Sequence, residues 1–352
     1  MPVTTSIRRF SYALAFLLAF VCAATVIAAE SSLGANVGAN LRSDPWIRPE
    51  QAPAPAENLP TSARVVLGQM LFFDPRLSRK ANMSCASCHN PALGWSDGLP
   101  TATGFDMKTL ARATPTIINT AFNPIQMWDG RKSTLEDQAL GPIEAGGEMN
   151  MPLPELVARL KTIHGYAAKF EDAYPGQGIS EVTVARAIAS FERTVLSTES
   201  PFDRWRMGDE KAVDDSAKRG FELFTGKANC AICHSGYNFT DNGFHNIGVK
   251  NTDPANPDVG RFAQKPLKSM RGAFKTPTLR DIALTAPYMR NGAYNTLMEV
   301  VEHYDRGGDD KDNLSINVVP LHLTAQEKTD LVAFMQSLTG APRLVNVPAL
   351  PH

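Results

Sequence analysis

Cysteine is scarce in this chain, which has only five among 352 residues. Four of the five form two short motifs, Cys85-Ala86-Ser87-Cys88-His89 and Cys230-Ala231-Ile232-Cys233-His234. The fifth, Cys22, lies in an apolar N-terminal run that we expect to be removed. This small number, grouped in close pairs, excludes a disulfide-rich scaffold and points to chemistry at the two motifs.

Long hydrophobic runs are also missing beyond the N-terminus, where no stretch approaches the roughly 18 to 20 apolar residues that span a bilayer. Residues 1–29 contain Arg8 and Arg9, an apolar run over 10–26 and small residues at the end, which is typical of a secretory signal peptide. Removal of the signal peptide takes away the two arginines and moves the formal charge from −1 to −3. A mildly negative mature protein gives no indication of binding to nucleic acid. We expect a periplasmic protein with no membrane span in its mature form.

Each Cys-x-x-Cys-His motif is typical of covalent haem attachment, in which two thiols add to the haem and the following histidine binds the iron. A redox dithiol or half of a zinc site are alternatives, but neither needs a histidine directly after the second cysteine. The sequence therefore predicts two haem c groups. We expect them on Cys85, Cys88, Cys230 and Cys233, with His89 and His234 as iron ligands.

A repeat surrounds the two motifs, since Gly68-Gln69-Met70-Leu71-Phe72-Phe73 precedes the first and Gly220-Phe221-Glu222-Leu223-Phe224 precedes the second. About 320 mature residues also exceed one ordinary core. We expect an irregular N-terminal lead over 30–60, a first haem domain over 61–200 and a second over 201–345, with a linker at 197–215.

Periodicity favours helix and loop over strand. Apolar positions at helical spacing are Leu156, Leu160, Ile163 and Phe170, then Val184, Ile188, Phe191 and Val195, then Leu331, Phe334, Met335 and Leu338. Thr324 and Glu327 form a capping box before the last helix, which Gly340 closes. Residues 92–112 and 240–276 read as loops. The predicted fold is mainly α, with two cytochrome c-like domains.

The function depends on the sixth ligand position of each iron. Two saturated irons would make an electron shuttle, whereas one open iron beside acid and base groups would make an enzyme. No histidine follows His89 until His164, which favours an open first iron. The methionines that remain as alternative ligands are Met107, Met127, Met149 and Met151.

Trp128, Gln138 and Glu148 follow one another at intervals of ten residues in a region rich in glycine and proline. A carboxylate in a desolvated pocket has a raised pKa, which suits it to take a proton from one peroxide oxygen and return it to the other. Taken singly, a tryptophan is more often a core residue and a loop glutamate is more often solvated. The three together are the predicted site of chemistry.

Several ordered segments make the chain similar to the bacterial di-haem cytochrome c peroxidases, and in particular to their MauG-like and MbnH-like subgroup, over roughly residues 67–340. The segments are Leu71-Phe72-Phe73-Asp74, Thr114-Pro115-Thr116 with Asn119 and Phe122-Asn123, Met127-Trp128-Asp129-Gly130-Arg131, Ser200-Pro201-Phe202-Asp203-Arg204, Phe239-Thr240-Asp241 with Phe244-His245-Asn246, and Thr276-Pro277-Thr278-Leu279-Arg280 with Ala286-Pro287-Tyr288.

The resemblance implies a peroxide-reactive first haem and an electron-transferring or charge-sharing second haem. It implies that Glu148 is the acid and base, that Gln138 is its hydrogen-bonding neighbour, that Trp128 bridges the haems and that Pro142 lines the distal pocket. It also implies a calcium ion, held partly by the backbone carbonyls of Thr285 and Pro287. The asparagine that some members contribute to this site is replaced here by Ala113.

Two departures from the ordinary peroxidases concern iron ligands. The loop through 104–106, where such members carry a capping histidine, has none. At the position of their second-haem methionine this chain has Tyr304, and MauG-like proteins use a tyrosine there. A phenolate is a hard anion that stabilises ferric iron, so Tyr304 would make the second haem a store of oxidising equivalents. Met298 is the alternative ligand, whereas adjacent His303 would point about 100 degrees away on a helix.

The sequence thus predicts a periplasmic haem peroxidase that uses hydrogen peroxide to form a high-valent di-haem state, which then oxidises a partner protein at a Trp or Tyr side chain. A cytochrome c peroxidase that reduces hydrogen peroxide with electrons from a small cytochrome c is the alternative enzyme. A two-haem electron shuttle is the non-enzymatic alternative.

Overall fold

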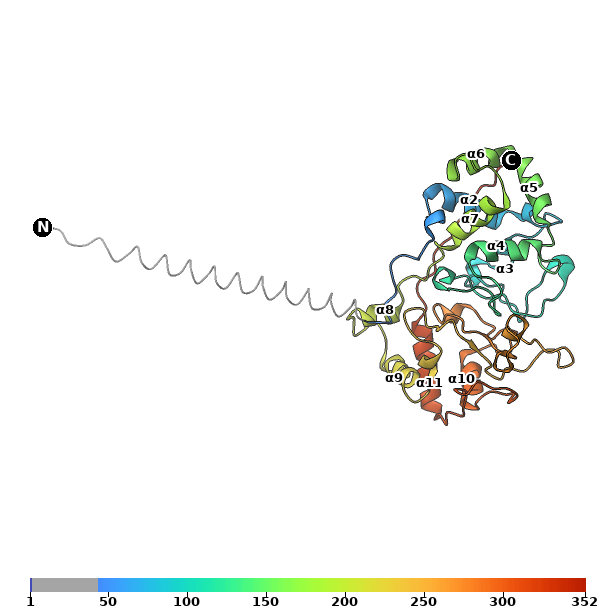
Figure 1. Ribbon diagram of the computed structural model, residues 1–352. Coiled ribbons are helices and arrows are strands. Elements are labelled where there is room, and N and C mark those ends of the chain that lie inside the picture. The colour runs from blue at the N-terminus through green and yellow to red at the C-terminus, as the bar shows by residue number, and fades with distance from the viewer. Residues whose placement is uncertain (2–43) are drawn as a thin grey trace. The chain divides into compact units, whose positions relative to one another are not determined.

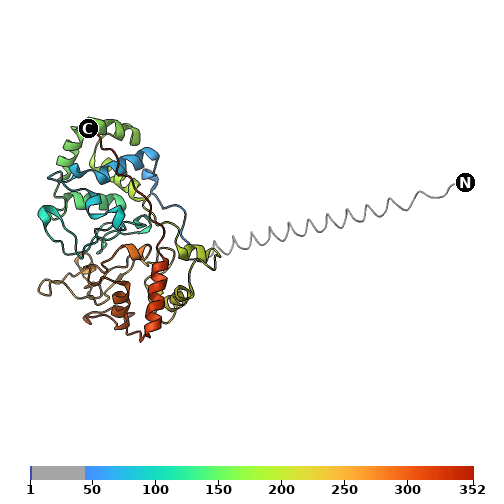
Figure 2. The same cartoon turned by 180° about the vertical axis from the view of Figure 1, so that it is seen from behind.

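The structure is a computed structural model that describes Met1 and residues 44–352 (Figures 1 and 2). The predicted signal peptide beyond Met1 and the start of the N-terminal lead lie outside the described residues. The α-helices described are α2 (Ser62–Phe73), α3 (Cys85–Cys88), α4 (Leu135–Glu144), α5 (Leu153–Lys161), α6 (His164–Ala173), α7 (Glu181–Glu192), α8 (Pro201–Arg206), α9 (Asp215–Thr225), α10 (Leu297–Asp305) and α11 (Ala325–Ser337).

Strand is confined, within residues 44–352, to the antiparallel pair β1 (Phe244–His245) and β2 (Phe274–Lys275) and to isolated bridges. Short 3₁₀ turns complete the described elements: η1 (Ala56–Asn58), η2 (Pro75–Leu77), η3 (Pro91–Leu93), η4 (Phe105–Met107), η5 (Thr120–Phe122), η6 (Cys230–Ile232), η7 (Arg261–Ala263), η8 (Lys268–Met270) and η9 (Ile282–Leu284). The predicted mainly α fold is confirmed.

Two helix pairs, α2 with α7 and α9 with α11, cross in the same way. At the first crossing a Cβ on Gly68 would lie 1.9 Å from the carbonyl oxygen of Ala187, and at the second a Cβ on Gly220 would lie 1.9 Å from that of Asp330. Only glycine permits so close an approach of two backbones. The sequence repeat therefore corresponds to a repeated helix crossing.

A second structural repeat lies, along the chain, between the two helices of each crossing pair. The bridge Gln126↔Lys132 precedes α4, which is capped by Thr134, and the bridge Tyr288↔Tyr294 precedes α10, which is capped by Thr296. Within the bridges, Met127 and Met289 both have positive φ, at 70° and 74°. Helices α4 and α10 are therefore equivalent elements of the two halves.

Some expected elements differ in detail. The helical pattern from Leu156 to Phe170 is divided between α5 and α6, because Ile163 has an extended backbone and forms the N-cap of α6. The expected linker at 197–215 contains α8, whose Phe202 is fully buried. For α11 the Thr324 and Glu327 capping box and the buried apolar stripe are confirmed.

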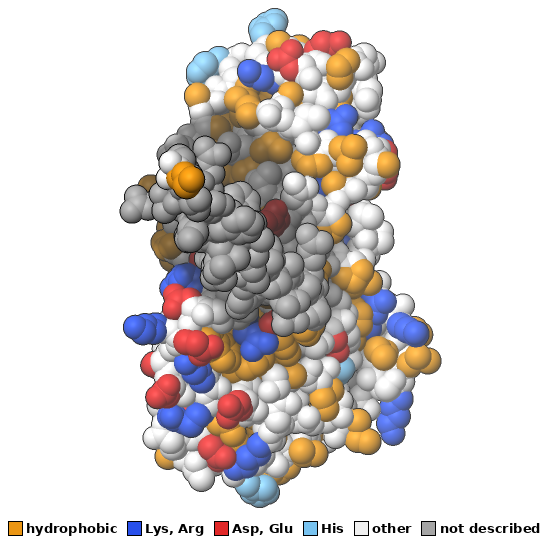
Figure 3. Space-filling model, turned by 90° about the vertical axis from the view of Figure 1, so that its left-hand side faces the viewer, with side chains coloured by type: hydrophobic (Ala, Val, Ile, Leu, Met, Phe, Trp, Pro, Cys, Tyr) orange, Lys and Arg blue, Asp and Glu red, His pale blue; other side chains and the backbone are white. Residues whose placement is uncertain are grey.

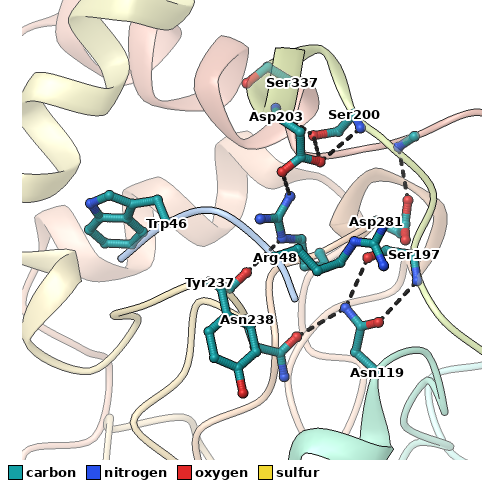
Figure 4. A network of polar contacts seen from close by, with 12 residues as sticks. Trp46, Arg48, Asn119, Ser197, Ser200, Asp203, Tyr237, Asn238, Asp281 and Ser337 are labelled. Carbon is teal, nitrogen blue, oxygen red and sulfur yellow. Dashed lines mark hydrogen bonds and ion pairs between the residues drawn. The ribbon is translucent and has the colours of Figure 1, made fainter. Parts of the chain in front are cut away.

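Polar contacts join the two halves, which belong to one compact unit, Arg48–His352. The Asn119 side-chain amide donates hydrogen bonds to Ser197 Oγ over 3.0 Å and to Asn238 Oδ1 over 3.1 Å (Figure 4). The chain end returns to the first half beside α6, where Gly165 N donates to His352 O (Figure 1). These contacts hold the halves together from several sides.

On the face that carries α9, acidic and basic side chains are interspersed with hydrophobic ones (Figure 3). Ion pairs there include Lys227 with Glu327 and Lys218 with Glu210. Within residues 44–352, no helix is long and apolar enough to cross a membrane.

Candidate active site: two cavities at the Cys-x-x-Cys-His motifs

The first motif opens into a cavity of about 700 Å³. Cys85 and Cys88, at the two ends of α3, line it together with His89. The other predicted site residues of the first half, Trp128, Gln138, Pro142 and Glu148, line the same cavity. The structure thus brings together residues that lie more than sixty positions apart in the sequence.

The second motif opens into a cavity of about 190 Å³. Cys230, Cys233 and His234 line it, as do Trp128 from the first half and Tyr304 from α10. Much of the remaining lining is apolar, including Phe224, Leu331 and Met335. An apolar cavity bordered by two thiols and an imidazole fits a covalently attached haem.

The motif histidines are oriented alike. Nδ1 of His89 lies 3.1 Å from the carbonyl oxygen of Trp95, and Nδ1 of His234 lies 2.8 Å from that of Phe239. A carbonyl can only accept, so each Nδ1 carries the proton and donates it. Each Nε2 is then left unprotonated as a donor atom for iron, with its ring orientation fixed.

The four motif cysteines are unpaired and suited to form thioether bonds. Burial raises the pKa of Cys88 to about 11 and that of Cys230 to about 12. The thiols are therefore held neutral rather than as reactive thiolates. These properties, with the cavities and the imidazoles, match the donor set that two haem c groups require.

Glu148 is partly buried in the first cavity. Burial raises the pKa of its carboxyl group, and the Arg131 guanidinium opposes that shift. Gln138 reaches the same cavity from α4. A carboxyl group with a raised pKa, in the same cavity as an amide, can hold and return a proton.

The structure separates the methionines considered as ligands of the first iron. Met107 is 81% exposed and Met151 is buried in the hydrophobic core, and neither lines the first cavity. Met127 and Met149 do line it. Among the described residues, His89 is the only histidine of that cavity.

The corresponding position in the two halves differs in chemistry. Pro142 is the eighth residue after the α4 cap Thr134, and Tyr304 is the eighth after the α10 cap Thr296; each lines its own cavity. Proline has no atom that binds iron, whereas tyrosine offers a phenolic oxygen. The two cavities are therefore unlike at this position.

Tyr304 lies within electrostatic reach of Cys230 and Cys233, and burial raises the pKa of its phenol. Met298 is not among the described residues that line the second cavity. His303 is fully buried, with Nδ1 2.8 Å from Tyr294 Oη and Nε2 2.8 Å from Ile247 O. Both nitrogens of His303 are thus already in hydrogen bonds away from the cavity.

Trp128 is the residue of the predicted set that lines both cavities. Its ring nitrogen donates a hydrogen bond of 3.0 Å to the carbonyl oxygen of Ala113. A third, smaller cavity of about 120 Å³ beside it is lined by Ala113, Thr285 and Pro287. The residues predicted for calcium therefore lie next to the tryptophan.

Three features of the cavities were not predicted from the sequence. Glu192 lines the first cavity from α7, and buried Lys275 lines the second. Residues 256–259, from the second half, also line the first cavity. Glu192 could have been noticed from the sequence, because it lies four residues after Ile188 on an apolar helix face. The positions of Lys275 and of residues 256–259 depend on how the two halves pack together.

Comparison with known proteins agrees with this geometry. The family model for di-haem cytochrome c peroxidase matches residues 62–211, and that for cytochrome c matches 217–339. The methylamine utilization protein MauG of Methylorubrum extorquens is 48% identical over 86% of each chain. The cytochrome c551 peroxidase of Pseudomonas aeruginosa is 37% identical over 81% of each chain.

Among solved structures, a MauG-like protein associated with microbial copper homeostasis superposes with a TM-score of 0.77 at 32% identity, covering 84% of this chain and 95% of that one. The sequence similarity spans both motifs and both cavities. The chain belongs to the di-haem cytochrome c peroxidase family.

Proposed function

We propose that this protein is a periplasmic di-haem enzyme that uses hydrogen peroxide to oxidise a partner protein, as a MauG-like member of its family. Similarity to MauG over most of the chain supports this assignment. The signal-like N-terminal sequence supports export.

The observation that carries the proposal is the contrast between Pro142 and Tyr304 at equivalent places in the two cavities. With proline at this position and His89 as the one histidine among the described lining residues, the first cavity would leave a bound haem a face for peroxide. Tyr304 would offer its phenolic oxygen to a haem in the second cavity, and such a hard donor would favour the oxidised states that suit this haem to store charge.

In the first cavity, each side chain has a separate task. The Glu148 carboxylate would take the proton from one peroxide oxygen and return it to the other, which leaves as water. The Gln138 amide orients the peroxide by hydrogen bonding. The haem, when bound, would supply an iron centre that gives electrons to the peroxide as the O–O bond breaks.

Trp128 would then connect the two redox centres, because this residue lines both cavities. The ring is fixed by its hydrogen bond to Ala113 and allows charge to be shared between the haems. The partner protein gives up its electrons at a Trp or Tyr side chain and does not need to enter the peroxide cavity.

We also propose a calcium ion at the carbonyls of Thr285 and Pro287. The third cavity offers carbonyl, hydroxyl and amide oxygens, which calcium prefers. Its described lining residues include no carboxylate, but they do include the cationic side chain of Lys275. We therefore expect weak binding of calcium. Its role would be to hold the backbone around Trp128.

The alternative function is reduction of peroxide with electrons from a small cytochrome c, as the similarity to the cytochrome c551 peroxidase suggests. Turnover of peroxide by the holoprotein with reduced cytochrome c separates the two. We expect the wild-type protein to turn over slowly and Tyr304→Met to turn over faster, because a thioether favours ferrous iron. Rapid wild-type turnover that Tyr304→Met lowers would support the alternative.

A further inference from the structure

Glu192, the last residue of α7, is a second carboxyl group in the first cavity and has no role in the chemistry proposed above. It is only 4% exposed. Its Oε2 atom is fully buried and has no hydrogen-bond partner among the described residues. A buried carboxyl oxygen without a partner is costly, so its presence here calls for an explanation.

The second half of the molecule has an apolar residue in its place. Phe191 packs against Gly68 and Phe334 packs against Gly220 at the two equivalent helix crossings. The residue after each phenylalanine lines the cavity of its own half, and these residues are Glu192 and Met335. The fold therefore does not require a carboxyl group here, and the carboxyl group is specific to the first haem.

The charges around Glu192 do not neutralise it. Adjacent Arg193 directs two guanidinium nitrogens to Glu136 on α4, over 2.8 and 3.1 Å. Cys85 on α3 is the other titratable group that interacts with Glu192, and haem attachment removes its proton. Helices α2 and α5 present apolar side chains to α7.

The electrostatic consequence follows from burial. Burial raises the pKa of Glu192 to about 8, which Glu136 reinforces and Arg193 opposes. The carboxyl group is thus poised between its two forms near neutral pH. In such a low-dielectric place, a change of one charge at a nearby centre shifts the proton affinity strongly.

We propose that Glu192 is the redox-linked proton site of the first haem: its carboxylate binds one proton from solvent when that haem gains one electron, and releases it when the electron is lost. One electron and one proton enter together, so the charge inside the cavity is unchanged and no bond to iron is formed or broken. The electron comes from an external one-electron donor. This proposal rests on the two-haem assignment and not on the reaction with peroxide.

The test is a spectroelectrochemical titration of the holoprotein between about pH 6 and pH 9.5, a range that includes the raised pKa of Glu192. In the wild type, we expect the reduction equilibrium constant of the first haem to fall as pH rises. The fall should approach tenfold per pH unit between the pKa values that Glu192 has in the oxidised and in the reduced protein. Glu192→Gln and Glu192→Met should remove this dependence. The methionine variant reproduces the apolar residue of the second half, which protects the fold.

Two controls accompany the titration. Glu144→Gln removes an exposed carboxylate from α4 and should leave the pH dependence intact. Infrared reduced-minus-oxidised difference spectra of the wild type should contain a carboxylic C=O band that shifts in D₂O and is missing in Glu192→Gln.

A first-haem potential that does not depend on pH in the wild type would overturn the proposal without any variant. So would a dependence that survives in both Glu192 variants. Either result would leave the peroxide chemistry untouched, since that depends on Glu148. Loss of peroxide reactivity with an intact pH dependence would count against the proposed function alone.

Discussion

The backbone amide of Lys275 donates a hydrogen bond of 2.8 Å to the carbonyl oxygen of Trp128. The indole nitrogen of Trp128 donates in turn to the carbonyl oxygen of Ala113. The aromatic residue that lines both cavities is therefore held by its backbone from the second half and by its ring from the first. These contacts fix the residue that, in our proposal, carries charge between the two haems.

Replacement of Trp128 by phenylalanine should slow charge sharing between the haems by about tenfold or more. A tenfold slower rate corresponds to an activation barrier that is higher by roughly 1.4 kcal/mol. The smaller ring has no N–H to bond Ala113 and is harder to oxidise. Stopped-flow spectra after one equivalent of peroxide would measure the rate. Trp205→Phe, which changes a tryptophan that lines neither cavity, should leave it unchanged.

Replacement of Glu148 by glutamine should lower the rate of the reaction with peroxide by about 10² to 10⁴, the usual contribution of a general acid and base. Because burial raises the pKa of Glu148, the wild-type rate should increase with pH through a midpoint above the ordinary glutamate value of about 4.3. The carboxylate form, which accepts the proton, gains population in that direction.

The pH profile of the glutamine variant should be flat in the same range. Glu155→Gln, at an exposed position of α5, is the matched control and should behave as the wild type. An unchanged rate in Glu148→Gln would remove this residue from proton transfer.

Replacement of Asp203 by asparagine should lower the free energy of unfolding by about 3 to 5 kcal/mol. Arg280 pairs with Asp203 over 2.6 Å and its side chain is 0% exposed, so the variant leaves a buried guanidinium without its carboxylate. Urea unfolding of the holoprotein would measure the change. Lys218→Ala breaks the exposed pair with Glu210 and should cost about 0 to 1 kcal/mol.

Removal of calcium with a chelator should weaken communication between the haems without releasing either haem, because the proposed carbonyl ligands of Thr285 and Pro287 line the cavity beside Trp128. The change would be followed by the peroxide-dependent spectra and reversed by added Ca²⁺. Retention of full communication in metal-free protein, verified by elemental analysis, would argue against this site.

The sequence was most informative where local spacing fixes the chemistry. The two Cys-x-x-Cys-His motifs, the repeat around Gly68 and Gly220, and the capping box of α11 each depend on neighbours in the chain, so they could be read directly. The division of α5 from α6 could not, because the extended backbone at Ile163 breaks a pattern that continues in the apolar residues.

Within the site, the roles of Glu148 and Tyr304 were predicted from resemblance and remain proposals. The structure adds that both line cavities with the motif residues. Glu192 and Lys275 were not predicted as site residues. The sequence shows a charged residue among apolar ones, but it does not show which cavity that residue lines. The contribution of residues 256–259 to the first cavity likewise depends on how two distant segments pack.

The most direct test of the central proposal is electron paramagnetic resonance of the resting ferric holoprotein, with and without Tyr304→Phe. We predict one high-spin signal from the first haem, which the variant leaves alone, and one low-spin signal from the second haem, which the variant alters. Two low-spin signals that do not respond to peroxide would contradict the account, because the first iron would then have no face on which peroxide could bind.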